Sequence, residues 1–301
     1  MSFSSDVKSE LCRQEGAGDC CGLAECYGVL LYCNTFSADQ VRIVTEHRGF
    51  AARITRLFDE TFAVPLENSG EAEGPGKVIL TLRGRETLGR IYAAFGYDAT
   101  TSLSLHVNLG VLEEDCCRAA FLRGAFLAGG SMIDPEKRYH WELMTSHLTV
   151  SREVRALLQD MGYEPKSVMR AGSSVLYFKQ SETIEDLLTL MGAPLCAMRM
   201  MNTKLEKELR NDVNRQVNCD TANLEKAVAA AQEQLDAIRV LEQRGQRLPG
   251  KLAQTAELRR QNPAATLQEL ANLATPPVSK SAMNHRLRKL VELAKTPQAD
   301  T

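Results

Sequence analysis

The chain has 301 residues, of which 44% are hydrophobic and 25% charged, and its formal net charge is −2. These values are ordinary for a globular protein of two or three domains, and the net charge by itself points to no class of partner. The distribution of charge is more informative: residues 201–301 contain 16 Lys and Arg against 12 Asp and Glu, whereas residues 1–200 contain 20 against 26. We therefore expect any contact with a polyanion at the C-terminal end.

Membrane, secretory and disulfide-rich classes are disfavoured by the sequence. No run is long and apolar enough to cross a bilayer, and the N-terminal stretch MSFSSDVKSELCRQ lacks a signal-peptide core. The nine cysteines are an odd number, and Cys26, Cys33 and Cys117 lie inside apolar helical patterns, as reduced buried thiols do. We expect a cytoplasmic protein without a cofactor.

One segment occurs twice, with an offset of 96 residues. Residues 20–36 read CCGLAECYGVLLYCNTF, and residues 116–132 read CCRAAFLRGAFLAGGSM. Each copy begins with a cysteine pair and continues as an apolar helix with a central glycine, Gly28 or Gly124. Such helices allow close packing of two backbones, so the repeat predicts two similar units that meet along a pseudo-twofold axis. Gly28, Gly124 and Gly130 are the predicted packing residues.

The periodicity of apolar residues predicts the same order of elements in each half. In the first half we expect helices at 3–12, 19–34, 49–62 and 86–95, with strands at 40–46 and 77–83. In the second half we expect helices at 115–129, 152–161 and 182–191, with strands at 139–146, 166–170 and 174–179. Each half is then an α+β unit with its helices on one face of an antiparallel sheet.

The last third of the chain has helical patterns only. A connector over 196–220 precedes an amphipathic helix over 223–244, for which Thr221 is the predicted N-cap and Gly245 the predicted stop. Its apolar face contains Leu224, Val228, Ala231, Leu235, Ile238 and Leu241. Three short helices follow at 248–258, 266–273 and 281–294. The predicted domains are the repeats 1–110 and 111–195, the connector 196–220 and an all-α module 221–296.

The short helices have the signature of a helix–turn–helix. Thr266 caps one helix with Glu269 three residues on, the sequence TPPVS forms a rigid turn, and Ser279 or Ser281 caps the last helix. We expect a small core under this motif, made of Leu267, Leu270, Leu273, Val278, Leu287, Leu290 and Val291.

Side chains suited to DNA recognition lie on the last helix. Asn pairs with adenine and Arg with guanine, while Lys and Ser bind phosphate. Residues 279–296 contain five Lys and Arg and one acid, Glu292. The predicted DNA-binding residues are Ser279, Lys280, Ser281, Asn284, His285, Arg286, Arg288 and Lys289, with Arg286 at the margin of the exposed face. We expect double-stranded DNA as partner; a three-helix module that docks on a protein is the alternative.

Two further sets of residues have open interpretations. Cys20–Cys21 and Cys116–Cys117 are metal ligands only if the two halves meet there, and no CxxC or nearby His pair supports that, so buried small residues are favoured and no metal is predicted. Basic residues of the second half either face DNA from the sheet or form a solvated surface. These are Arg152, Arg155, Lys166, Arg170 and Lys179.

The doubled helix resembles a degenerate form of the LAGLIDADG motif of homing endonucleases. The resemblance implies two αββαββα units packed through these helices, with a metal-binding acid just before the terminal glycine of each motif. If Gly124 and Gly130 are the central and terminal glycines, the acid positions fall on Gly129 and, 96 residues earlier, Cys33. Neither is a carboxylate, so we predict no nuclease activity and no catalytic residue. Asp134, Glu136 and Asp115 lie nearby at the wrong phase.

Taken together, the parts resemble the WhiA family. The resemblance is carried by Phe3–Leu11, Asn214–Cys219 with Ala222–Asn223, the degenerate pair and Val278–Leu293. It implies a DNA-binding regulator of cell division, chromosome segregation or sporulation septation, with a sigma-factor-like terminal module and association with the nucleoid. A partner regulator or RNA polymerase is implied as a further contact. Two alternatives remain open: a nuclease with relocated carboxylates, and an adaptor that docks on the transcription machinery.

Overall fold

The computed structural model describes residues 2–14, 18–68, 76–98 and 104–296, and the chain divides into two compact units, Met1–Lys207 and Glu208–Thr301. Each unit has its own hydrophobic core. Within the described residues, no helix is both long enough and apolar enough to span a bilayer.

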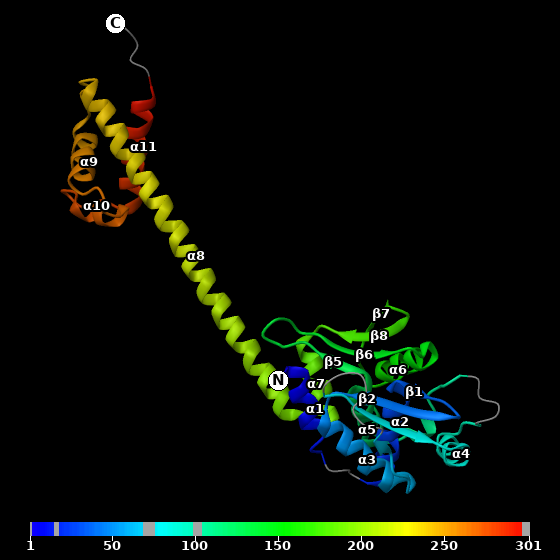
Figure 1. Cartoon of the computed structure of the whole chain (residues 1–301). Helices are drawn as coiled ribbons and strands as arrows, with labels where there is room; N and C mark the ends of the chain where they lie inside the picture. The colour runs from blue at the N-terminus through cyan, green and yellow to red at the C-terminus, as the bar shows by residue number, and fades with distance from the viewer. Residues whose placement is uncertain (1, 15–17, 69–75, 99–103, 297–301) are drawn as a thin grey trace. The chain divides into compact units, whose positions relative to one another are not determined.

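Unit 1 begins with α1 (Phe3–Leu11) and then contains the same series of elements twice (Figure 1). The first series is α2 (Asp19–Tyr32), β1 (Thr35–Phe36), β2 (Gln40–Thr45), α3 (Arg48–Phe62), β3 (Glu67–Asn68), β4 (Val78–Arg83) and α4 (Arg85–Ala94). After the single turn η1 (Leu109–Val111), the second is α5 (Asp115–Gly129), β5 (Gly130–Met132), β6 (Trp141–Thr145), α6 (Leu148–Asp160), β7 (Lys166–Arg170), β8 (Ser173–Phe178) and α7 (Ser181–Met191). The predicted αββαββα pseudo-dimer is confirmed.

The two sheets have the same antiparallel topology. Their strand orders are β1-β2-β4-β3 and β5-β6-β8-β7, so the central strands of each sheet are the second and fourth strands of its half. In the second sheet Trp141 pairs with Phe178 and Leu143 with Leu176, and all four side chains are buried. Because side chains alternate along a strand, these residues define the face that packs on the helices.

Most sequence-predicted elements lie within a few residues of the observed ones, with two exceptions in unit 1. Strands β1, β3 and β5 were not predicted, because two or three residues are too few to show alternation. Helix α6 begins at Leu148, not at 152, since the chain turns at His147, whose backbone N–H donates to Thr145 Oγ1.

Unit 2 is all-α. It contains the later part of α8 (Pro194–Gln243), which begins in unit 1, followed by α9 (Gly250–Gln261), α10 (Leu267–Leu273) and α11 (Lys280–Lys295). The predicted break at Thr221 is wrong: α8 runs through this residue without interruption. A threonine supplies a cap only where the helix has another reason to end, and residues 213–243 contain no Gly or Pro.

The core of unit 2 differs in part from the predicted one. Leu270, Leu287 and Leu290 are fully buried as expected, but Leu273 is 50% exposed and Val291 is only partly buried. Met283 fills the centre instead, together with Ile238 and Leu241 from α8. Leu224 and Val228, predicted on the same apolar face of that helix, are exposed.

Candidate nucleic-acid interface

The helix–turn–helix is held by caps at the start of each of its two helices. Thr266 and Glu269 form the predicted capping box, in which each side chain accepts a hydrogen bond from the other residue's backbone N–H. Ser279 is the N-cap of α11, and its hydroxyl accepts from the backbone N–H of Ala282 at 3.2 Å. These bonds satisfy amide groups that a helix start leaves unpaired, so they fix where α11 begins.

Contacts from α9 and from α10 itself hold the turn between α10 and α11. The Val278 backbone N–H donates to the Ala271 carbonyl at 3.1 Å, and the Gln254 side-chain amide of α9 donates to the Thr275 carbonyl at 3.0 Å. The buried Arg259 of α9 donates to the Ala265 carbonyl at 2.7 Å, just before α10. The direction of α11 is therefore set by bonds on both sides of the turn.

Helix α11 has a buried face and an exposed basic face. Met283, Leu287 and Leu290 are completely buried. On the opposite side Ser281, His285 and Arg288 are exposed and, at spacings of four and three residues, lie above one another. Of the other predicted DNA-binding residues, Ser279, Lys280 and Lys289 are exposed, and Asn284 and Arg286 are half-buried.

The charges on this face differ in their availability. Lys289 Nζ lies 3.3 Å from a carboxylate oxygen of Glu292, one turn on, so part of its charge is neutralised. Within the part of the chain that the structure describes, Arg288 and Lys280 have no ion-pair partner. A guanidinium without an internal partner keeps its five donors for an external acceptor.

In unit 1 the doubled helices α2 and α5 pack directly on each other, and the contacts repeat with the 96-residue offset. A Cβ at Gly28 would lie 2.1 Å from the Phe121 carbonyl oxygen, and a Cβ at Gly124 would lie 2.1 Å from the Glu25 carbonyl oxygen. Only glycine permits this approach. Gly130, the first residue of β5, has its nearest atoms in Phe126 of the preceding helix α5, so this glycine does not lie between the two helices.

A buried charge network crosses the same helix pair. The Glu25 carboxylate of α2 accepts from Arg53 of α3 at 2.5 Å and 2.8 Å and from Arg123 of α5 at 2.8 Å. In the 96-residue repeat, the position equivalent to Glu25 is Phe121, and the position equivalent to Arg123 is Tyr27. The second copy therefore lacks the acid and the first copy lacks the arginine, so the repeat is asymmetric here.

The two positions that would hold catalytic acids in a LAGLIDADG nuclease are closed. A Cβ at Gly129 would lie 2.6 Å from the Met144 carbonyl oxygen and 2.9 Å from the Tyr32 ring, so an acidic side chain does not fit there. Cys33 is shielded and donates to the Leu30 and Thr35 carbonyls, and burial raises the pKa of its thiol to about 12. A protonated thiol is a poor ligand for Mg²⁺.

No carboxylate cluster replaces them within the described residues, where four cysteines are the only group of three or more His, Cys, Asp or Glu side chains close enough to hold an ion. Asp134 accepts from the Glu136 backbone N–H at 2.9 Å and so supports a turn.

At the end of α5, the Lys8 ammonium donates to the Leu127 carbonyl at 3.0 Å, and burial lowers the pKa of Lys8 to about 8.

The basic residues of the second half do not share one face. Lys166 and Arg170 lie on the same side of β7, opposite the buried face of the sheet. Lys179 follows directly after β8, and all three side chains are exposed. Arg152 and Arg155 lie on α6, which packs on the buried face through the Ser151–Ser174 hydroxyl pair at 2.8 Å. These two arginines therefore cannot contribute to a contact made by the open face of the sheet.

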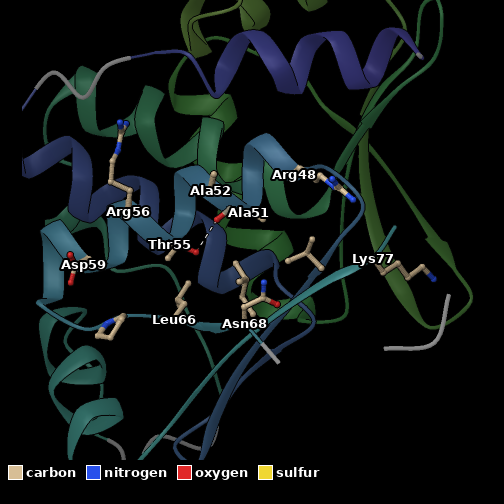
Figure 2. A pocket seen from close by; sticks show the side chains of 12 residues that line it. Arg48, Ala51, Ala52, Thr55, Arg56, Asp59, Leu66, Asn68 and Lys77 are labelled. Atoms are coloured by element: carbon tan, nitrogen blue, oxygen red, sulfur yellow. Dashed lines mark hydrogen bonds between the residues drawn. The ribbon is translucent and has the colours of Figure 1, made fainter. Parts of the chain in front are cut away.

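A groove beside the first sheet has mixed charge (Figure 2). It lies between α3 and strands β3 and β4, with Arg56 and Asp59 toward one end and Arg48 and Lys77 toward the other. Among the lining residues that the structure describes there is no cysteine or histidine and one carboxylate, so they do not supply the paired groups that metal or nucleophilic chemistry needs.

Comparisons with known proteins agree with this architecture. A family model described as "WhiA LAGLIDADG-like domain" matches residues 118–210, and one described as "WhiA C-terminal HTH domain" matches residues 213–294. The chain resembles the solved structure of full-length DUF199/WhiA from Thermotoga maritima with a TM-score of 0.62 at 20% identity, covering 98% of both chains. The N-terminal LAGLIDADG domain of DUF199/WhiA matches with a TM-score of 0.51 at 19% identity, covering 64% of this chain and 90% of that one.

Curated relatives match along nearly the whole sequence. The "Probable cell division protein WhiA" of Ruminiclostridium cellulolyticum is 40% identical over 304 residues, covering 98% of this chain and 97% of the relative. A protein with the same description from Alkaliphilus metalliredigens is 34% identical, covering 98% of each. With a degenerate helix pair in the first unit and a capped helix–turn–helix in the second, the chain belongs to the WhiA family.

Proposed function

We propose that the protein is a sequence-specific DNA-binding regulator in which α11 enters the major groove. The observation that carries this proposal is the exposed basic face of a helix that is capped and held on both sides of its turn. Ser281, His285 and Arg288 face outward together, and an exposed guanidinium such as that of Arg288 can make a bidentate contact to guanine. The Ser279 cap and the first amides of α11 suit a phosphate.

The biological process is inferred from the relatives. Their description as probable cell division proteins supports a role in cell division, with chromosome segregation or sporulation septation as the finer expectation. A regulator of this kind would associate with the nucleoid.

The test is DNA binding by single-residue variants of the full-length protein. Genome-wide mapping of bound sites supplies the DNA duplex, and anisotropy titrations at several salt concentrations give the affinity. Arg288→Ala should weaken binding by about 1–3 kcal/mol and relax the preference at one base pair. Lys280→Ala should weaken binding to all sequences alike and reduce the salt slope by about one.

Arg239→Ala is the matched control, because Arg239 is also an exposed arginine of unit 2 but lies on α8 and pairs with Asp236 at 3.1 Å. It should bind DNA as the wild type does. Equal affinities for wild type and Arg288→Ala would remove Arg288 from the residues that read the base sequence. Binding that depends on a protein partner and not on DNA would favour the adaptor hypothesis.

We further infer that the LAGLIDADG-like unit has lost nuclease activity and serves binding. Three observations support this inference: the lack of room at Gly129, the raised thiol pKa of the half-buried Cys33, and the ammonium of Lys8 near the end of α5. The open face of the second sheet, with Lys166, Arg170 and Lys179, suits an added DNA contact or a partner protein such as RNA polymerase or another regulator. Cleavage of supercoiled DNA in the presence of Mg²⁺ or Mn²⁺, abolished by Asp134→Ala, would refute the loss of activity.

A further inference from the structure

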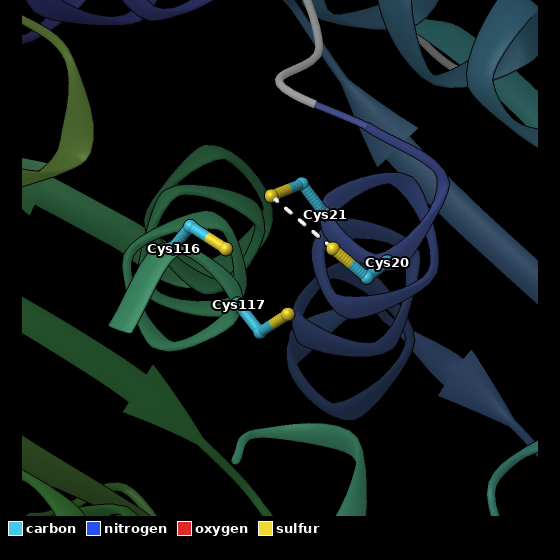
Figure 3. Close-up of side chains that lie close together, drawn as sticks. All are labelled: Cys20, Cys21, Cys116 and Cys117. Carbon is cyan, nitrogen blue, oxygen red and sulfur yellow. Dashed lines mark hydrogen bonds between the residues drawn. The ribbon is translucent and has the colours of Figure 1, made fainter. Parts of the chain in front are cut away.

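The first turns of α2 and α5 bring four cysteines together. Cys20 and Cys21 are the second and third residues of α2, and Cys116 and Cys117 occupy the same places in α5. Their four Sγ atoms all lie within 4.8 Å of one another, and Figure 3 shows them converging between the two helices. The 96-residue offset relates one pair to the other, so the pseudo-twofold axis of unit 1 passes between them.

We propose that Cys20, Cys21, Cys116 and Cys117 bind one zinc ion across the two halves of unit 1. Four thiolates around one point are the ligand set of a closed structural zinc site. Such a site uses every ligand from the protein and leaves none open for a substrate, so its role is to hold the two halves together.

The distances fit a single ion. With Zn–S bonds of about 2.3 Å, the edges of a regular tetrahedron of sulfurs are about 3.8 Å long. Cys20 Sγ and Cys21 Sγ are already 4.0 Å apart, and the longest separation in the group is below 4.8 Å. A contraction of about 1 Å at most, within reach of side-chain rotation, completes the tetrahedron. A cubane iron–sulfur cluster places four irons and four sulfides between its cysteines and needs them further apart.

The surroundings of the four cysteines also favour the negative charge of a zinc–tetrathiolate centre. Binding displaces one proton from each thiol, so four protons leave, Zn²⁺ enters and the site carries a net charge of −2. Both cysteine pairs lie in the first turn of a helix of 14 or 15 residues, where the helix dipole favours negative charge. Cys21 and Cys117 are buried, which shields two of the ligands, while Cys20 and Cys116 are exposed and give the ion a route of entry.

The observed placement of the four cysteines bears on the sequence-based interpretation of the two pairs. The prediction that these cysteines are buried small residues is confirmed for Cys21 and Cys117 and is wrong for Cys20 and Cys116, which are exposed. The condition under which the sequence allowed a metal site, that the two halves meet at the cysteine pairs, is fulfilled by the packing of α2 on α5.

The experiment measures metal in the full-length protein purified with a non-thiol reductant and without chelator. Elemental analysis after equilibration with zinc should give one zinc per chain. Replacement by cobalt(II) should give the visible absorption bands of a tetrahedral tetrathiolate centre. In the double variant Cys20→Ser/Cys116→Ser, both zinc and the cobalt bands should be lost. The exposed positions are chosen so that the fold is retained, which circular dichroism and the fluorescence of the single Trp141 verify.

Cys219→Ser is the control, because Cys219 is an exposed thiol of unit 2 outside the cluster. It should keep one zinc per chain. The proposal is overturned if the wild type takes up neither zinc nor cobalt, if the double variant retains them, or if one ion is shared by two chains. It is also overturned if mass spectrometry finds disulfides among these cysteines, seen as a loss of two hydrogens per bond.

Discussion

Gly124→Ala is the sharpest test of how the two halves of unit 1 meet. The new Cβ would lie 2.1 Å from the Glu25 carbonyl oxygen and 3.1 Å from the Val29 nitrogen, whereas Cβ atoms are essentially never found within 3.0 Å of another heavy atom. Both neighbours are backbone, so no side chain can turn away. The helices α2 and α5 must therefore separate by about 0.9 Å at this point.

The expected loss of stability follows from two opposing effects. Gly→Ala in a helix interior ordinarily stabilises by about 1 kcal/mol. Overpacking of a close-packed interior costs about 1–3 kcal/mol, and more where backbone has to move. Since every contact along the helix pair shifts with the backbone, including the Glu25 network, we expect a net destabilisation of at least about 2 kcal/mol.

Gly89→Ala provides a control of opposite sign. Gly89 lies inside α4, and a Cβ there meets no atom within 4 Å, so only the helix-propensity gain of up to about 1 kcal/mol remains. Urea unfolding followed by the fluorescence of Trp141, the single tryptophan and a fully buried residue of unit 1, reports on this unit alone. A Gly124→Ala protein that is as stable as the wild type would show that the helices are not in close backbone contact.

Two further predictions use the same fluorescence assay. Glu25→Gln removes the carboxylate shared by Arg53 and Arg123 and leaves two buried guanidinium groups without a counter-charge, so we expect a loss of about 3–5 kcal/mol, and a loss below 1 kcal/mol would contradict the network. The pKa of Lys8 falls from 10.5 in the unfolded chain to about 8 in the folded protein, so between these values the unfolded state binds more protons and stability rises with pH. The stability of the wild type relative to Lys8→Met should therefore increase by up to roughly 3 kcal/mol across that range, and a constant difference would show that Lys8 is not buried.

The sequence predicts the elements whose determinants are local. The capping box of Thr266 and Glu269 and the cap at Ser279 follow from side chains within three residues of the amides they bind. Thr221 has the same chemistry but lies inside α8, because no residue around it stops the helix. Leu273 was expected in the core but is half exposed, and Met283, which was not assigned to the core, is buried there. Burial in so small a module depends on the packing of α8 and α9, which periodicity along one helix does not report.

Features that join distant segments were harder to predict. The repeat indicates that Gly28 and Gly124 are close to a partner helix, but only the packed structure shows that Gly129, and not Gly130, approaches Tyr32. The cysteine cluster escapes the usual spacing rules, which describe ligands within one segment, because its two pairs are 96 residues apart. Arg152 and Arg155 were grouped with the sheet by proximity in sequence, although α6 places them on the other side.

The asymmetry of the Glu25–Arg123 pair bears on which segments associate while the chain folds. Helices related by a repeat are natural candidates for self-pairing, in which two copies of α2 or two copies of α5 from different chains would join. In a pair of two α5 helices, each Arg123 would face Phe121 in the place that Glu25 has in the native pair. Its guanidinium would then be buried without an acid, at a cost of several kcal/mol. Two α2 helices would leave Glu25 with one arginine where it has two. We therefore expect this single charged pair to discriminate against intertwined dimers and aggregates during synthesis, and to direct each chain to close upon itself.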